Sequence, residues 1–195
     1  MILGLTGGIA SGKSTVSNYL KKMGIKIIDA DLMAKEISEK KEIKEEIALK
    51  LGKDLLNSSY EIDREKLKKI VFKNKEKLEV LNKIYHPRIR EEFKKIKENS
   101  NKDDIIVFDV PLLFETGIDK ECDKVILIFI KEEIQIKRLI KRDGIDRELA
   151  IQIIRSQMSQ EEKKNKADII IYNNGSLDNL KEETKKVINK IVRRK

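Results

Sequence analysis

The fold is decided by residues 2–14, which read ILGLTGGIASGKS. A short apolar run comes first, and the pattern G-x-x-x-x-G-K-[ST] follows at Gly7, Gly12, Lys13 and Ser14. The glycines of this pattern let backbone N–H groups turn inward around a phosphate, and the start of the next helix adds its positive end to the same site. The stretch therefore predicts a strand, a phosphate-binding loop and a helix, which together form a βα unit.

Lys13 and Ser14 have separate expected roles in this loop. Lys13 can reach the β- and γ-phosphates of a nucleotide, and the Ser14 hydroxyl can complete a Mg²⁺ shell. The alternative is a glycine-rich turn that binds nothing. Because a strand precedes the loop and a helix follows it, the phosphate-binding interpretation is favoured, with ATP and Mg²⁺ as the expected cofactors.

Further apolar runs predict the rest of a sheet. Residues 2–5, 26–28, 105–110 and 125–130 read as buried strands, and residues 169–172 as a fifth. A helix is expected from about Lys13 to Met23, closed by Gly24 in a left-handed cap position. The predicted fold class is therefore α/β, with a P-loop NTPase core in which a parallel sheet is flanked by helices.

Two helical segments interrupt this core. From about residue 35 to 100, apolar residues recur at spacings of three and four without a convincing strand. We expect one helix around Leu67, a second around Leu81 and a third that starts near Pro87, since proline suits a first helical turn. The second segment runs from about 132 to 166. A single domain, 1–195, is expected, with its core at about 1–34, 101–131 and 167–195.

Composition narrows the class of protein. The net charge of +9 suits a phosphate-rich partner, either a nucleotide or a nucleic acid, although a solvated lysine-rich surface is the simpler interpretation. Cys122 is the only cysteine, which excludes an intrachain disulfide and favours a reducing compartment, so a cytoplasmic location is expected. No segment approaches the roughly 18 apolar residues of a membrane span. The short apolar start is also too brief for a signal peptide.

Carboxylates follow two of the predicted strands. Asp29 and Asp31 come directly after the second strand, at the edge where open α/β sheets bind ligands. Asp31 is either the N-cap of the next helix or a base for an attacking hydroxyl, and its position leaves both open. Asp109 ends the third strand, where an acidic residue commonly holds Mg²⁺. The alternative is a loop carboxylate that caps a turn.

Basic side chains outside the loop are further candidates. His86 is the only histidine, and a lone histidine is more often structural than catalytic. Arg138 and Arg142 lie four residues apart on one helical face, which suits a clamp on phosphate oxygens, while ordinary surface salt bridges are the alternative. The letters of a guanine-binding segment occur at 165–168, but they precede an apolar run, which disfavours a GTPase.

Several segments, taken in order, resemble the dephospho-CoA kinase family over nearly the whole chain. They are residues 5–14, 29–31, 63–64 with 67 and 70–72, 86–87 with 89–90, 109–115, 135 with 138–139 and 142–143, 157–158, and 167–168 with 173 and 175. The phosphate loop alone is common, whereas the ordered set is specific. One departure is Ala10, where many relatives have glycine, and we expect a negative φ there.

The resemblance implies an activity and an architecture. The γ-phosphoryl group of ATP would pass to the ribose 3′-hydroxyl of dephospho-CoA, giving coenzyme A and ADP, the last step of coenzyme A synthesis. The 35–100 insertion would be a helical substrate-binding domain, and the 132–166 segment would be a helical lid.

The resemblance also implies which residues form the site. The catalytic residues would be Asp31 as the base, with Lys13, Arg138 and Arg142 neutralising charge on the transferring group. ATP would bind Ala10, Ser11, Gly12, Lys13, Ser14, Thr15 and Asn173. Dephospho-CoA would contact Asp31, His86, Arg90, Leu112, Leu113, Phe114 and Glu115. Mg²⁺ would be held by Ser14 and Asp109.

Two other functions stay open on the sequence. A kinase for another small nucleotide or hydroxylic metabolite would share the whole phosphate loop and differ in the insertion. A P-loop nucleic-acid-binding ATPase is motivated by the positive charge and predicts salt-sensitive binding. The expected partner is a small-molecule substrate, with no nucleic acid and no membrane, and the expected assembly is a monomer or weak homo-oligomer.

Overall fold

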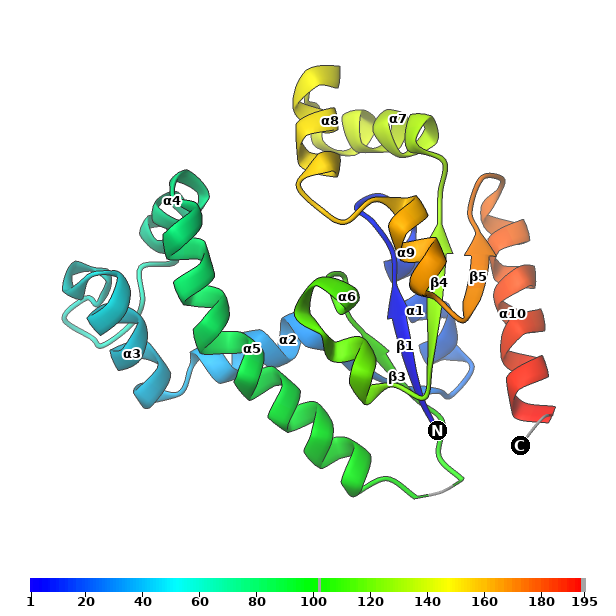
Figure 1. Ribbon diagram of the computed structural model, residues 1–195, viewed down its shortest axis with the longest axis horizontal. Coiled ribbons are helices and arrows are strands. Elements are labelled where there is room, and N and C mark those ends of the chain that lie inside the picture. The colour runs from blue at the N-terminus through cyan, green and yellow to red at the C-terminus, as the bar shows by residue number, and fades with distance from the viewer. Residues whose placement is uncertain (102, 194–195) are drawn as a thin grey trace. The chain divides into compact units, whose positions relative to one another are not determined.

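The structure is a computed structural model that describes residues 1–101 and 103–193, apart from the side chains of residues 72 and 73. The chain forms two compact units (Figure 1). The core unit comprises Met1–Ile28 and Ser100–Lys195, and the helical unit comprises Asp29–Asn99. The helical unit covers much the same residues as the segment at about 35–100 that the sequence marked as helical.

In the part of the chain that the structure describes, five strands make up the sheet, in the order β2-β3-β1-β4-β5. They are β1 (Ile2–Thr6), β2 (Lys26–Asp29), β3 (Ile106–Asp109), β4 (Lys124–Phe129) and β5 (Ile169–Tyr172). β1 pairs in parallel with β3 and β4, and β4 pairs in parallel with β5. All five predicted strands are confirmed, and the parallel α/β fold class with them.

Each face of β1 packs against different helices. Leu3 and Leu5 belong to a buried cluster that includes residues of α1 (Lys13–Lys22) and α10 (Leu177–Arg193). Gly4 points to the opposite face, where an added Cβ would lie 2.9 Å from the Leu113 side chain. α6 (Leu113–Thr116) therefore lies directly on β1, followed by the short 3₁₀ helix η2 (Ile118–Glu121). Burial on both faces explains why β1 reads as a continuous apolar run.

The second predicted helical segment contains α7 (Glu132–Asp143), α8 (Arg147–Arg155) and α9 (Gln160–Lys166). α7 ends at Gly144, whose φ is 67°. α8 is capped by Asp146 and α9 by a capping box between Ser159 and Glu162. α7 and α8 share a small apolar cluster against which Ile9 and Ala10 of the phosphate loop pack. α7 and α8 are thus in contact with the loop within the core unit.

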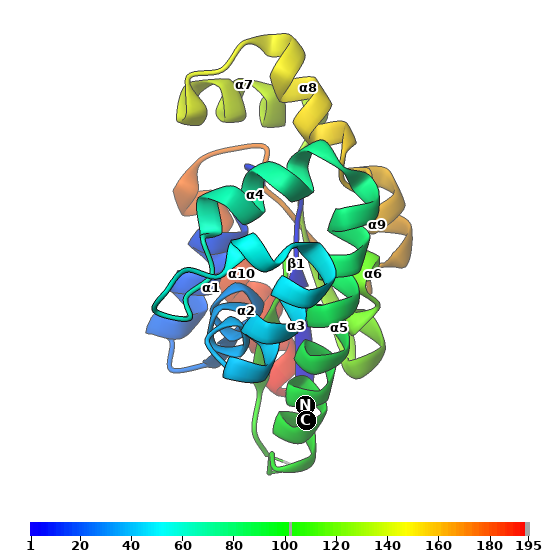
Figure 2. The ribbon, with the colours of Figure 1, turned by 90° about the vertical axis from the view of Figure 1, so that its left-hand side faces the viewer.

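The helical unit contains α2 (Ala30–Ser38), α3 (Lys41–Leu51), η1 (Lys53–Leu55), α4 (Arg64–Lys73) and α5 (Lys75–Glu98). α2, α3 and α4 all contact α5, as Figure 2 shows for α3 and α4. Ile43, Ile47, Ile84 and Phe93 are buried. The helical character expected for this segment is therefore observed.

The expected third helix, starting near Pro87, is wrong. Pro87 lies in the middle of α5, a single helix of 24 residues. Proline offers no N–H to the carbonyl four residues before it and crowds that carbonyl. The Arg88 guanidinium donates to the carbonyl of Ile84 at 2.6 Å, beside the interrupted turn. The helix continues because Ile84 and Ile89 are buried on either side of the proline, and burying both outweighs the local cost.

The helices can also be compared with a membrane span. α5 is the longest and carries charged residues along its whole length. None of the helices in the described residues is long and apolar enough to cross a membrane.

Candidate active site

The phosphate loop connects β1 to α1 at the carboxyl end of the sheet. The Ser11 N–H donates to the carbonyl of Gly8 at 3.0 Å, and α1 begins at Lys13 with Gly12 as its N-cap. Gly12 has a φ of 90°, and an added Cβ would lie 2.4 Å from Nδ2 of Asn173, so only glycine fits there. Among the described residues no side chain caps α1, so its first N–H groups face outward for an anion.

Ala10 has a backbone conformation that differs from the one expected. Its φ is 59°, so the expected negative value is wrong. The left-handed conformation costs a non-glycine residue roughly 1–2 kcal/mol. The surrounding contacts therefore determine the backbone conformation at Ala10, and the intrinsic preference of alanine does not.

Lys13 and Asp109 meet at the end of the loop. Asp109 ends β3 and pairs in register with Leu5 of β1, which places its carboxylate next to the start of the loop. Lys13 Nζ forms an ion pair with Asp109 Oδ1, and Asp109 is only 4% exposed. The contact found for Asp109 is thus with the loop lysine. The pair offsets the cost of burying both charges.

A cavity of about 410 Å³ opens beside the loop in the core unit. Its lining residues are Ala10, Gly12, Ser14, Thr15, Arg138, Arg142, Asn173, Leu177 and Leu180. The structure thus brings together most of the residues expected to bind ATP with the two arginines of α7. A volume of this size suits a small-molecule ligand.

Asn173 reaches the loop from the end of β5. Its N–H donates to the carbonyl of Phe129 at 2.8 Å, which extends the sheet by one residue beyond β5. Its side-chain Nδ2 donates to the carbonyl of Ser11 at 2.7 Å. Arg138 lies 3.5 Å from Oδ1 of Asn173, whereas Arg142 pairs with Asp143 at 2.6 Å. Arg142 therefore makes a surface salt bridge while it also lines the cavity.

In the helical unit, the N-cap of α2 is Asp29. Its carboxylate accepts from the N–H groups of Asp31 and Leu32 at 2.8 and 3.2 Å. The interpretation of Asp31 as the N-cap is therefore wrong, because Asp29 already fills that position. Asp31 lies in the first turn of α2, and the base interpretation remains.

His86 and Arg90 lie one turn apart on α5, also in the helical unit. His86 is half-buried and Arg90 is exposed. Burial, with a smaller contribution from the charge of Arg90, lowers the pKa of His86 below its usual value. Neutral imidazole is therefore the favoured form near pH 7.

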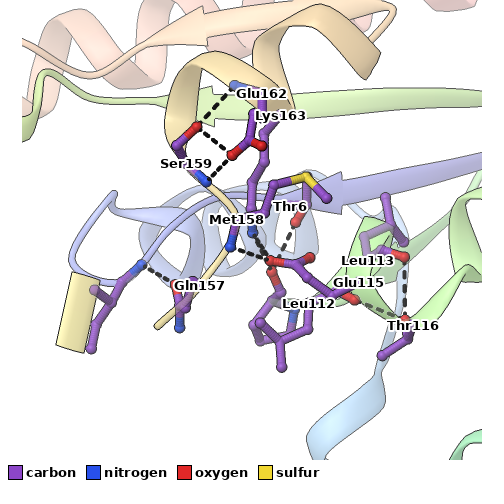
Figure 3. Close-up of polar contacts among 12 residues, drawn as sticks. Thr6, Leu112, Leu113, Glu115, Thr116, Gln157, Met158, Ser159, Glu162 and Lys163 are labelled. Carbon is purple, nitrogen blue, oxygen red and sulfur yellow. Dashed lines mark hydrogen bonds and ion pairs between the residues drawn. The ribbon is translucent and has the colours of Figure 1, made fainter. Parts of the chain in front are cut away.

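The run from Leu112 to Glu115 lies where β3 leads into α6. Leu113 is fully buried, whereas Leu112 is 39% exposed. Glu115 forms a 2.8 Å ion pair with Lys163 of α9, whose side chain is 0% exposed, and accepts from the N–H of Met158 at 3.2 Å (Figure 3). Glu115 thus connects α6 to α9 and to the segment before it.

Comparison with known proteins decides the family. The family model described as dephospho-CoA kinase matches residues 1–179. This chain belongs to the dephospho-CoA kinase family. The dephospho-CoA kinase of Fusobacterium nucleatum is 56% identical over 180 residues, covering 92% of this chain and 93% of the relative. That of Carboxydothermus hydrogenoformans is 46% identical over 192 residues, covering 97% and 93%.

A solved structure from the same family has the same fold. The dephospho-CoA kinase from Campylobacter jejuni superimposes with a TM-score of 0.77 at 34% identity, covering 98% of this chain and 97% of that one. Membership of the dephospho-CoA kinase family identifies the chain as a nucleotide-using kinase of coenzyme A synthesis. The resemblance noted in the sequence is confirmed.

Sequence reasoning assigned no role to three further residues: two of them contact the loop, and the third, Lys163, pairs with Glu115. Gln135 and Gln157 occur in segments that resemble the dephospho-CoA kinase family, but nothing in the sequence linked them to the loop. Both bond to Ile9, with Gln135 donating to its carbonyl and Gln157 accepting from its N–H. Lys163 gave no signal at all, because it lies in a lysine-rich helix that reads as solvated.

Ser14 and Asp109 are the residues expected to hold Mg²⁺. Within residues 1–101 and 103–193, no group of three or more His, Cys, Asp or Glu side chains is arranged to hold a metal. Mg²⁺ in kinases usually needs only one or two protein oxygens, with substrate phosphates and waters supplying the rest. The exposed hydroxyl of Ser14 and the carboxylate of Asp109 are hard oxygen donors beside the same loop, so they fit this ion.

Proposed function

We propose that this chain transfers the γ-phosphoryl group of ATP to the ribose 3′-hydroxyl of dephospho-CoA, releasing coenzyme A and ADP. The observation that carries the proposal is the match of residues 1–179 to the family model. The cavity that joins the phosphate loop to Arg138, Arg142 and Asn173 supports it, because a triphosphate needs both the loop amides and nearby cations.

In the proposed reaction, Asp31 accepts the proton of the 3′-hydroxyl as its oxygen attacks the γ-phosphorus. The bond from that phosphorus to the β–γ bridging oxygen breaks, and ADP leaves. Phosphoryl transfer depends on positioning and charge neutralisation, because there is little covalent chemistry for the protein to do. Lys13, Arg138 and Arg142 supply the positive charge, and the loop N–H groups orient the phosphates.

In the proposed site, ATP and dephospho-CoA contact two different sets of residues. ATP binds Ala10, Ser11, Gly12, Lys13, Ser14, Thr15 and Asn173, and dephospho-CoA contacts Asp31, His86, Arg90, Leu112, Leu113, Phe114 and Glu115. Mg²⁺, held by Ser14 and Asp109, neutralises phosphate charge when bound. Residues 35–100 act as the substrate-binding segment and 132–166 as the lid, which must exclude water to limit ATP hydrolysis.

The proposed setting is the cytoplasm, with the protein a monomer or weak homo-oligomer. A single cysteine supports a reducing compartment. Dephospho-CoA is the proposed partner, without nucleic acid or membrane. If salt-sensitive nucleic-acid binding were found, the P-loop nucleic-acid ATPase would regain support.

An acceptor panel tests the proposal. ATP consumption is measured with dephospho-CoA, nucleoside monophosphates and shikimate, each with Mg²⁺. We expect stimulation by dephospho-CoA alone, and loss of it in Lys13→Ala, because that variant lacks the loop cation. Stimulation by another acceptor, with none by dephospho-CoA, would assign the chain to a different kinase activity.

A further inference from the structure

Both peptide groups of Ile9 are held by glutamine side chains. Gln135 of α7 donates from Nε2 to the Ile9 carbonyl at 2.7 Å. The Ile9 N–H donates to Oε1 of Gln157, in the connection between α8 and α9, at 3.1 Å. One glutamine donates and the other accepts, so each matches one polar group of Ile9.

The residue between Ile9 and Ser11 is Ala10, with its left-handed φ of 59°. The carbonyl of Ser11 accepts from Nδ2 of Asn173 at 2.7 Å. Side-chain amides therefore hold the backbone on both sides of the one non-glycine residue of the loop that has a positive φ. A conformation that alanine disfavours persists only where its surroundings impose it.

The two glutamines are themselves fixed. Gln135 is only 2% exposed. Met158, next to Gln157, donates its N–H to Oε1 of Glu115 at 3.2 Å, and Glu115 pairs with the buried Lys163 (Figure 3). The segment that carries Gln157 is thus tied to α6 and α9, so its amide has little freedom to follow a relaxing loop.

We propose that Gln135 and Gln157 form an amide clamp that holds Ala10 in its strained conformation and so shapes the phosphate loop before ATP binds. They are positioning residues, because they act on ATP through the Ile9 peptide groups. Neutral amides suit this task, since a carboxylate at either position would place a negative charge beside the loop that receives phosphates. The inference rests on the proposed function in that the loop binds ATP.

The two glutamines of the clamp come from different parts of the lid segment. Gln135 lies in its first helix, and Gln157 lies in the connection before its last helix. The cluster formed by Ile136, Leu139 and Ala150, against which Ile9 and Ala10 pack, lies between these two points in the sequence. A movement of the lid segment would therefore change the conformation of the loop backbone that binds the phosphates.

Isothermal titration calorimetry with Mg²⁺–ATP, without acceptor, tests the clamp. Gln157→Ala should bind ATP about tenfold more weakly, because it leaves the Ile9 N–H unpaired and releases the loop. Gln152→Ala is the matched control, since Gln152 is an exposed glutamine on α8 of the same segment, and it should bind like the wild type. Gln157→Met, which keeps the length without a strong acceptor, replaces Gln157→Ala if the alanine variant does not fold.

A double-variant cycle separates a clamp from a merely structural role. In Gln157→Ala, the further change Ala10→Gly should recover most of the lost ATP affinity, because glycine adopts a positive φ without strain. Ala10→Gly in the wild-type background completes the cycle, and its own effect on ATP affinity is the reference against which the recovery in the double variant is measured. Additive effects, or an affinity of Gln157→Ala within twofold of the wild type, would overturn the clamp.

The same titrations distinguish a failure of the clamp proposal from a failure of the proposed function. If the wild type binds ATP but phosphorylates another acceptor, the proposed function fails, and the clamp is still judged by the affinity series. If the wild type makes coenzyme A while Gln157→Ala keeps its ATP affinity, the clamp alone fails.

Discussion

Asp29 and Asp31 lie two residues apart and differ in what their carboxylates contact. Asp29 accepts the N–H groups at the start of α2, including that of Asp31. Sequence reasoning left Asp31 open between the N-cap of the next helix and the base, because a carboxylate directly after a strand can take either role. The hydrogen-bond geometry of the turn settles the cap only.

The base assignment predicts a selective loss in Asp31→Asn. We expect kcat to fall by about 10²–10⁴-fold, because a general base contributes on that scale, with ATP affinity unchanged. Asp29→Asn is the matched control, since asparagine caps a helix as well as aspartate and should leave kcat near that of the wild type. Should Asp31→Asn turn over within a few-fold of the wild type, Asp31 is not the base.

The positive φ of Ala10 predicts that replacing this residue with glycine increases the stability of the protein. Ala10→Gly should raise the free energy of unfolding by about 0.5–1 kcal/mol, because relief of the left-handed strain exceeds the added entropy of the unfolded chain. Urea denaturation measures the change. Ala34→Gly, inside α2, is the control with the opposite sign and should lower the free energy of unfolding by about 1 kcal/mol. A lower stability for Ala10→Gly would contradict the strain.

Among the helices and strands, the sequence predicted those features that depend on neighbouring residues in the chain. The strands follow from continuous apolar runs, and α1 ends before Gly24, which has the expected positive φ of 82°. The helix start predicted near Pro87 is wrong because a single proline carries only a local preference, whereas α5 is held by burial on both sides of Pro87. The Lys163–Glu115 pair was not predictable, since it joins helices far apart in the chain.

The Lys163–Glu115 ion pair predicts that substitutions of its two residues have coupled effects on the free energy of unfolding. Lys163→Met should lower the free energy of unfolding by about 2 kcal/mol, below the usual cost of breaking a buried pair because Glu115 is 22% exposed. Adding Glu115→Gln should recover part of the loss, since no unpaired charge then remains. Lys166→Met, at an exposed position of α9, is the control and should change stability by less than 0.5 kcal/mol. Equal losses in the single and double variants would contradict the coupling.

For the whole molecule, the sequence predicted the fold class but could not predict the order of the strands. β1 lies between β3 and β4, and such pairing joins residues about 100 positions apart, which no local pattern encodes. The phosphate-loop half of the site was predictable because its residues are consecutive. Gln135 and Gln157 reach that loop only through tertiary contacts. The assignment of a substrate-binding segment and a lid stays a prediction.

Transfer of the γ-phosphoryl group to the 3′-hydroxyl of dephospho-CoA is tested by ³¹P NMR of the product formed from Mg²⁺–ATP and dephospho-CoA. We expect one new phosphomonoester signal coupled to the ribose 3′ proton, with one ADP formed for each coenzyme A. ADP without that signal, or phosphate attached at another hydroxyl, would contradict this transfer.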